Sequence, residues 1–521
     1  MPQDQPSIAI TRRTALGLVT SSVLVTSAAS VARAQAKPDL VVAIPTDGIS
    51  LDPHRSSTAA DYPILNNIFE GLYGHDENGD LVPLLAESVE ASPDGLTYVF
   101  KLRKNAKFHN GDPVTADDVR FSWQRAIDPA IRNPRATALA ANIANVEVVD
   151  PQTAKITLKQ RDPALLDNMN SLWTIVPKKY IEQVGNEEFG KKPIGSGPFM
   201  FVEKRQNEYS KIKGFEQHWG RVPKVNMVTY RIVPDDQARL AQVQTGEADL
   251  ITNIPPPLAA RSQKLANVHV ISRPAMSHQS VHYNDITGTR LKDKDVRVAL
   301  NMLVDRNALA KTVMSGFATP EILFCAEGTS GCDASKVQLH KFDPKAAREM
   351  LVKAKFDFDK PLKFVGPLGA RMPQGKEVME ATSYFFKQAG VKLELVTMDF
   401  GAWLAVASAK TKDPTVDMCM EIFPDYSKDN IVRLRRQFYS TELWSWADDK
   451  SLDAMFDKAF QITDPKVREA ETAAIIKKIH DDALVMPLWT VSNIYLARQT
   501  VSWKPTLNAT WPVLWNIEKK S

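Results

Sequence analysis

Hydrophobic and polar residues alternate between positions 96 and 102, which is the pattern of a β-strand with one buried face. The letters SPDG at 92–95 precede it and predict a turn, because proline presets φ and glycine accepts a positive φ. Further on, Asn110-Gly111 signals a second turn, and Thr115 with Asp118 predicts the capped start of a helix. Residues 86–127 therefore predict a structural module of strands and a helix, and indicate no ligand by themselves.

Strand-like and helix-like patterns alternate over the remaining chain, without internal repeats. Residues 39–45 predict a short buried strand, and the apolar runs at 146–149 and 154–158 predict a hairpin. Val296, Leu300 and Leu303 fall on one helical face. Further helices are predicted to start at Asp305 and end at Gly316, to open at Asp343-Pro344, and to run from Asp464-Pro465 through Lys478. This mixture predicts α/β or α+β lobes.

The first 36 residues predict a cleaved export signal. Arg12-Arg13 precede an uncharged, weakly hydrophobic run from 15 to 32, and small residues offer A-x-A cleavage at Ala34 or Ala36. The alternative is a membrane anchor, which the many hydroxyl residues of the run disfavour. We therefore expect a soluble periplasmic protein exported by a twin-arginine-type signal.

The remaining chain, about 485 residues, is too long for one hydrophobic core, so two or three subdomains are expected. Its net charge is small, about +2 once the leader's three arginines and one aspartate are removed from the total of +4. No basic field for nucleic acid follows from this balance. No later segment approaches the length of a membrane span.

Three cysteines allow three pairings. We favour a Cys325–Cys332 disulfide because the loop between them, AEGTSG, is short and flexible, and we expect Cys419 to be a small buried hydrophobe. If the chain folds before export in a reducing compartment, the bridge forms late and is not required for folding. A Cys325→Ser variant that fails to fold in the cytoplasm would contradict this hypothesis.

No sequence pattern supports catalysis or metal binding. The chain lacks G-x-S-x-G, H-E-x-x-H and a P-loop, and Pro198 after Gly195-Ser196-Gly197 makes that segment a sharp bend, not a phosphate cradle. His278 and His282 lie in a predicted extended segment, roughly 13 Å apart at about 3.3 Å per residue, too far to share one ion. His109 is predicted to be a surface or packing residue. We expect no cofactor, no resident metal and no enzymatic activity.

Several motifs, in order along the chain, resemble those of extracellular solute-binding protein family 5, the peptide/nickel-type binding components of ABC importers. The motifs are LDP at 51–53, FEGL at 69–72, LLAES at 84–88 leading into the 86–127 block, PIGSGPF at 193–199, GEAD at 246–249, and DVRVALN at 295–301 with Asp305-Arg306. Ser196 stands where the family pattern has threonine. Each motif is weak alone, but their order over most of the chain makes the resemblance specific.

The resemblance implies an α/β bilobal periplasmic binding protein with two hinge crossovers and an extra subdomain inserted in the first lobe. Lobe I is then predicted to comprise 37–274 plus 490–521, with the insert at about 75–190, and lobe II to comprise 275–489. The crossovers are expected near 272–277 and 487–493. Family members capture a small-molecule solute between the lobes by hinge bending and deliver it to permease subunits in the inner membrane, which work with an ATPase. We expect a monomer.

Candidate ligand residues also follow from the resemblance. Peptide-binding members hold the ligand's amino group with an aspartate of the second lobe, and the corresponding stretch EIFPDYS at 421–427 implies Asp425 with Tyr426; the family's preceding Gly-Trp is missing. Arg371 lies near the carboxylate-clamping arginine of peptide-binding members. Trp403, Trp444 and Trp446 are candidate stacking walls. The strand-end loop Asp47-Gly48-Ile49 is a general contributor to the family's cleft.

Each candidate has a structural alternative. Asp425 and Arg371 could be solvated loop residues, and each tryptophan could be core packing. A carboxylate plus an arginine suits a short peptide or an amino-acid conjugate such as an opine, whereas tryptophans suit an oligosaccharide and a metal chelate needs no protein histidine. From a different class, an exported hydrolase would need a catalytic pair in the cleft. A sensor subunit that signals to a chemoreceptor is a third interpretation.

Overall fold

The computed structural model describes residues 36–56, 58–134, 142–171, 173–287, 290–369, 372–424, 428–507 and 513–520. Residues Lys37–Ser521 form one compact unit, separate from Met1–Ala36. The twin arginines and the signal run of the predicted leader lie outside the described residues. Among the residues that are described, no helix is long and apolar enough to cross a membrane.

An eleven-stranded mixed sheet organises the compact unit. Its strand order is β15-β14-β16-β12-β17-β11-β1-β10-β9-β8, and β13 pairs with β17 beside this path. The strands on the β8 side of β17 form the first half of the sheet: β1 (Leu40–Ile44), β8 (Phe199–Arg205), β9 (Tyr209–Gly214), β10 (Met227–Ile232) and β11 (Leu250–Ile251). Those on the β15 side form the second half: β13 (Ala318–Pro320), β14 (Leu362–Pro367), β15 (Leu393–Met398) and β16 (Met418–Pro424).

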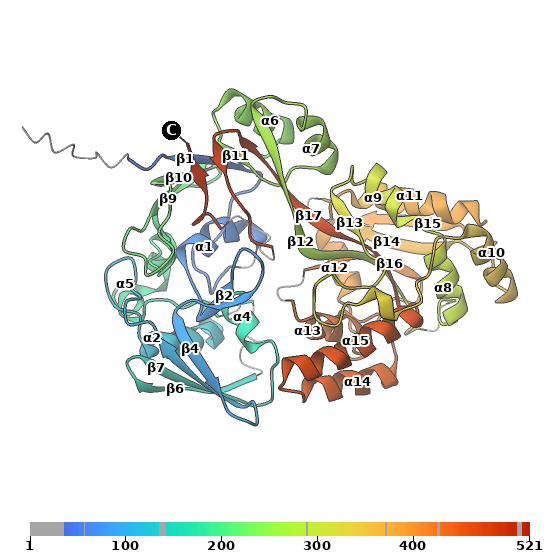
Figure 1. Ribbon diagram of the computed structural model, residues 1–521, viewed down its shortest axis with the longest axis horizontal. Coiled ribbons are helices and arrows are strands. Elements are labelled where there is room, and N and C mark those ends of the chain that lie inside the picture. Colours follow the sequence, from blue (N-terminus) through green and yellow to red (C-terminus); the bar gives the residue numbers. More distant parts are fainter. Residues whose placement is uncertain are drawn as a thin grey trace, which may run out of the picture. The chain divides into compact units, whose positions relative to one another are not determined.

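Two long strands, β12 (Val268–Tyr283) and β17 (Val485–Arg498), join the halves. They pair antiparallel from Val268↔Arg498 to His282↔Val485, and Figure 1 shows them crossing side by side between the two halves. Their register shifts between Pro274 and Ser277, where Met276 has a φ of 47°. The crossovers expected at 272–277 and 487–493 fall on these strands, which continue through them without a break; the lobe boundaries themselves stay predictions.

The first half buries its own hydrophobic core between strands and helices. Leu40, Val42, Val228 and Leu250 are fully buried there, and Phe317, Val268 and Leu496 belong to a second cluster on the other side of β1. The helices of this part are α1 (Tyr62–Ile68), α6 (Asp236–Thr245) and α7 (Pro256–Ser262). A short strand pair, β18 (Val501–Ser502) with β19 (Glu518–Lys519), follows β17.

Between β1 and β8 the chain forms a separate four-stranded antiparallel sheet of order β4-β5-β7-β6 with its own core. The predicted strand, turn and capped helix of this insert are confirmed: Phe100 and Leu102 are buried with Lys101 exposed, Gly95 has a φ of 65°, and Thr115 and Asp118 form a capping box. The insert's elements are β2 (Tyr73–His75), β3 (Leu81–Pro83), β4 (Ala86–Ala91), β5 (Thr97–Leu102), α2 (Ala116–Ile127), β6 (Ile143–Asp150), β7 (Thr153–Leu158), α4 (Leu165–Ser171) and α5 (Lys178–Lys191). The predicted hairpin corresponds to β6 and β7.

The second half has the helices α8 (Lys294–Met302), α9 (Arg306–Thr312), α10 (Pro344–Lys353), α11 (Gly375–Gln388), α12 (Phe400–Ala407), α13 (Ile431–Phe438), α14 (Lys450–Phe460) and α15 (Pro465–Asp481), of which α13, α14 and α15 pack in a cluster of their own. The predicted N-caps at Asp305, Asp343 and Asp464 are confirmed. Helix α9 ends at Thr312, before the predicted Gly316, because Gly316 (φ 81°) closes the following turn by donating to the Ala310 carbonyl. Helix α15 runs three residues past the predicted Lys478.

Candidate ligand-binding site

The strand-end loop Asp47-Gly48-Ile49 is anchored from both sides. The Asp47 carboxylate, 6% exposed, lies 2.9 Å from the Lys204 ammonium of β8 and accepts from the Asn207 backbone N–H at 2.8 Å. A Cβ on Gly48 would lie 2.8 Å from Asp61 Oδ1, so the backbone here packs where only glycine fits. The Ile49 side chain alone projects outward, at 66% exposure. Asp47 and Gly48 thus hold the loop, and Ile49 is the residue that it presents.

The three candidate tryptophans meet in one cluster at the end of β16. Trp403 on α12 is 2% exposed and donates its indole N–H to the Met420 carbonyl at 3.0 Å. Trp446 is 1% exposed and donates to Glu421 Oε1 at 2.7 Å. Trp444 is only half-buried, with its ring centroid 5.4 Å from Phe423 and 6.1 Å from Trp403. Trp403 and Trp446 therefore form the support, and Trp444 is the accessible member.

Three further candidates lie outside the described residues: Arg371, Asp425 and Tyr426. The residues that flank the second pair are described. Pro424 ends β16, next to the tryptophan cluster, and Lys428 places its ammonium 2.6 Å from the Asp80 carboxylate of the β2–β3 turn. Pro424 thus belongs to the second half of the sheet, and the Lys428 side chain contacts the insert.

A second contact joins the insert to the α14–α15 connection. Arg161 donates to the Asp94 carbonyl of the β4–β5 turn at 2.6 Å and also to the carbonyl of Gln461. Among the described candidates, the structure thus forms two separate groups: the 47–49 loop, held by Lys204 of β8, and the tryptophans at the end of β16.

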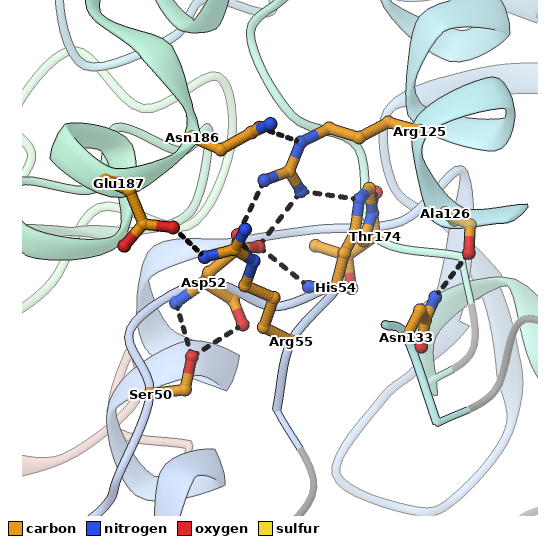
Figure 2. A network of polar contacts seen from close by, with 10 residues as sticks. All are labelled: Ser50, Asp52, His54, Arg55, Arg125, Ala126, Asn133, Thr174, Asn186 and Glu187. Carbon is orange, nitrogen blue, oxygen red and sulfur yellow. Dashed lines mark hydrogen bonds and ion pairs between the residues drawn. The ribbon is translucent and has the colours of Figure 1, made fainter. Parts of the chain in front are cut away.

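The loop that follows Ile49 is held by a buried polar network (Figure 2). Arg125 of α2 donates to both oxygens of Asp52, at 3.0 and 2.6 Å, and these side chains are 5% and 1% exposed. Arg125 also contacts His54 Nδ1 at 3.0 Å, and His54 Nε2 bonds to the Thr174 carbonyl at 2.9 Å. The network ties the loop between β1 and α1 to the insert, so the Asp of the LDP motif serves structure.

His109 locks the Gly195-Ser196-Gly197 bend. Its Nδ1 accepts from the Gly195 N–H at 3.2 Å and its Nε2 donates to the Gly197 carbonyl at 2.9 Å. A Cβ on Gly195 would come 2.1 Å from the Ile68 carbonyl oxygen, so the bend packs directly on the end of α1. The predicted packing role of His109 is confirmed, and desolvation by burial, partly opposed by the bond to Gly197, lowers its pKa to about 4.

Acid is expected to destabilise the protein through His109. Because its folded pKa lies below the ordinary 6.5, the neutral ring contributes stability above pH 6.5 that is lost as pH falls toward about 4. Protonation would place a second N–H against the Gly195 donor. We expect His109→Gln to reduce the loss of unfolding free energy between pH 7 and 4 by about 2–3 kcal/mol relative to the unaltered protein. Urea unfolding at a series of pH values measures this, and parallel curves for the two proteins would contradict it.

Cys325 and Cys332 form a disulfide, while Cys419 is a buried free thiol. The disulfide loop supports the chain that begins at Lys428: the Ser330 N–H donates to the Lys428 carbonyl, and the Asn430 side chain donates to Thr329 Oγ1 and to the Ser330 carbonyl, each at 2.8 Å. The loop closed by this bridge therefore holds the backbone of Lys428, whose side chain contacts Asp80 of the insert.

The histidines predicted to lie on extended chain do so, on β12. His278 Nδ1 contacts both oxygens of Glu321, at 2.8 and 3.0 Å, and His282 stacks on Phe438 with a centroid distance of 5.6 Å. Over the described ranges, no group of three or more His, Cys, Asp or Glu side chains could hold a metal ion.

Sequence reasoning missed Glu421 and Lys412, which lie under the tryptophans. Glu421 is fully buried on β16 and Lys412 is 2% exposed, and its ammonium lies 4.6 Å from the Trp446 ring centroid. A signal for Glu421 existed: a carboxylate directly follows the apolar run Met418-Cys419-Met420 in a predicted buried segment. Lys412 has no such signal, because its loop reads as polar and solvated.

Comparison with known proteins identifies the family. Residues 80–441 match the family described as "Bacterial extracellular solute-binding proteins, family 5 Middle". The glutathione-binding protein GsiB of Shigella dysenteriae serotype 1 (strain Sd197) is 32% identical over 403 residues, covering 76% of this chain and 75% of GsiB.

Solved structures agree on the fold. The ABC transporter substrate-binding protein CtaP of Listeria monocytogenes superposes with a TM-score of 0.82 at 25% identity, covering 93% of this chain and all of CtaP. The periplasmic binding protein DppA of Helicobacter pylori, in complex with the peptide STSA, gives a TM-score of 0.76 at 23% identity over 93% of this chain and 98% of DppA. The expected bilobal α/β fold is confirmed. This chain belongs to the bacterial extracellular solute-binding proteins of family 5, the binding proteins of transport systems.

Proposed function

We propose that this protein is the periplasmic binding subunit of an ABC importer, and that its solute is a short peptide or an amino-acid conjugate. The proposal rests on the 32% sequence identity to a glutathione-binding protein over three quarters of both chains, since glutathione is a small peptide. The solute is captured between lobe I (37–274 plus 490–521, insert about 75–190) and lobe II (275–489). Closure bends the two crossovers on β12 and β17, and the closed form docks on the permease.

The placement of the candidates supports this proposal. Trp444 offers a half-buried aromatic surface beside Phe423 of β16, and Ile49 supplies an exposed apolar contact from the other lobe. Asp425 pairs the ligand ammonium, and Arg371 clamps its carboxylate, because a planar guanidinium matches a carboxylate in two parallel bonds. The protein is a monomer without enzymatic activity, delivered by the twin-arginine-type signal.

Mass spectrometry of the small molecules released on denaturing freshly purified mature protein tests the proposal. A peptide or amino-acid conjugate in stoichiometric amount is the expected result. The same compound, titrated back, should raise the melting temperature in a concentration-dependent way, because a ligand that binds only the folded state stabilises it by about 2.7 kcal/mol at 100 times Kd. Release of an oligosaccharide or a metal chelate would contradict the proposed ligand class. Chemical conversion of the compound by the protein would contradict the proposal that it is not an enzyme.

A further inference from the structure

Two buried charged side chains hold the segment 443–446 from its core side. The Lys412 ammonium donates to the Leu443 carbonyl at 2.7 Å and to the Ala407 carbonyl, at the end of α12, at 2.6 Å. It also lies over the Trp446 ring. Lys412 thus binds the first residue of this segment and the face of its last residue, and fixes both relative to α12.

Glu421 holds the same segment from the sheet. Its Oε1 accepts from the Trp446 indole N–H at 2.7 Å, so the indole has the Glu421 carboxyl group at its edge and an ammonium over its face. Burial disfavours the charged form of both groups: desolvation raises the pKa of Glu421 to about 8 and lowers that of Lys412 to about 8. The attraction between the two charged forms opposes part of each pKa shift.

Lys412 has its two carbonyl acceptors, but the second oxygen of Glu421 has no hydrogen-bond partner among the described residues. Glu421 Oε2 lies 3.8 Å from His282 Nε2 and opposite Ser280 on β12, and in the described part of the chain these three groups have unpartnered polar atoms. Arg433 of α13 faces the same space but bonds to the Phe324 carbonyl and Asn430. Buried charged groups add little stability over apolar side chains of similar volume, so stability alone does not account for this arrangement.

We propose that Lys412 and Glu421 are positioning residues for ligand binding, which clamp the segment 443–446 so that Trp444 stands at the proposed site in one orientation. This inference rests on the proposed function. The Trp444 ring contacts Phe423 and Trp403, and the nearby Leu443 and Trp446 are the residues that the clamp fixes. Loosening the clamp therefore frees Trp444 without removing it.

Binding measurements on a small set of variants test the proposal, and their probe is the compound that mass spectrometry finds released from the denatured protein. At a temperature well below melting, Lys412→Met and Glu421→Leu should each raise Kd about 10-fold, whereas Glu421→Gln, whose amide oxygen still accepts from Trp446, should stay within about 3-fold. Lys458→Met, which removes an exposed lysine of the same lobe, is the matched control. In a Trp444→Ala background, Lys412→Met should cost nothing further, because the two residues act through one contact.

Amide hydrogen exchange of ligand-free protein separates this proposal from the proposed function. Lys412→Met should speed exchange across residues 443–446 while leaving the β12–β17 amides as slow as in the unaltered protein, whatever the ligand proves to be. An unchanged exchange rate at 443–446, or an equal loss of affinity with and without Trp444, would overturn the positioning role. Failure to find any ligand would overturn the proposed function alone.

Discussion

Arg125→Met is expected to destabilise the mature protein by about 3 kcal/mol, since it removes the closer counter-charge of the buried Asp52 carboxylate and leaves only Arg55, which is partly exposed and whose Nε lies 3.8 Å from Asp52 Oδ2. Asp52 is 1% exposed and receives two bonds from the guanidinium, and the remaining bond that it accepts from the His54 backbone N–H, at 3.0 Å, cannot neutralise it. The same substitution removes the bonds from Arg125 to His54 and to Asn186 (Figure 2). Midpoints of urea and thermal unfolding at neutral pH measure the loss.

Lys155→Met provides the matched control, because its pair with Glu147 on β6 and β7 is 2.9 Å long but exposed. That variant should lose no more than about 1 kcal/mol. The double variant Asp52→Asn with Arg125→Met should recover part of the loss, since no uncompensated charge then stays buried. Equal destabilisation by Arg125→Met and Lys155→Met would show that the network is not buried in solution as the structure has it.

Asp425→Asn is expected to weaken binding of a short peptide by about 2–3 kcal/mol, roughly 30- to 150-fold in Kd, because the ligand ammonium loses its counter-charge on desolvation. Isothermal titration calorimetry measures the change. N-acetylation of the peptide removes the other partner of the same pair, so the acetylated peptide should bind the unaltered protein and the Asp425→Asn variant with similar, weak affinity.

The exposed Asp448 of the same lobe is the control for charge, and Asp448→Asn should leave Kd unchanged. If Asp425→Asn and Asp448→Asn change Kd by the same factor, Asp425 is a solvated loop residue and another group binds the ligand ammonium. If the acetylated peptide binds as tightly as the free one, the ligand's amino group takes no part in recognition.

The insert shows what can be predicted from interactions between residues that are close in sequence. Its turn at Gly95, its capping box at Thr115 and Asp118, and its alternating strand 97–102 all follow from interactions between residues a few positions apart. Where a boundary depended on a distant contact, the prediction was off: α9 stops short of Gly316, which instead closes the next turn.

The candidate site shows what residues close in sequence do not predict. A tryptophan suits a ligand wall and a core equally well, and no neighbouring residue tells the two apart. The structure separates Trp403 and Trp446, whose indole N–H groups are bonded in the core, from the half-buried Trp444. Asp47 gave no sequence signal of its partner either, because Lys204 lies on another strand more than 150 positions away.

By itself, the sequence determined the family, several of the helices and strands, and their caps and turns, because periodicity and capping act over a few residues and the family motifs are contiguous. Only the tertiary structure decided that β12 and β17 pair along their length, that Asp52 serves a buried network, and that Lys412 and Glu421 lie under the tryptophans. These arrangements depend on which distant side chains share a dry, close-packed interior, where the neighbours of a charge set its protonation and its partner.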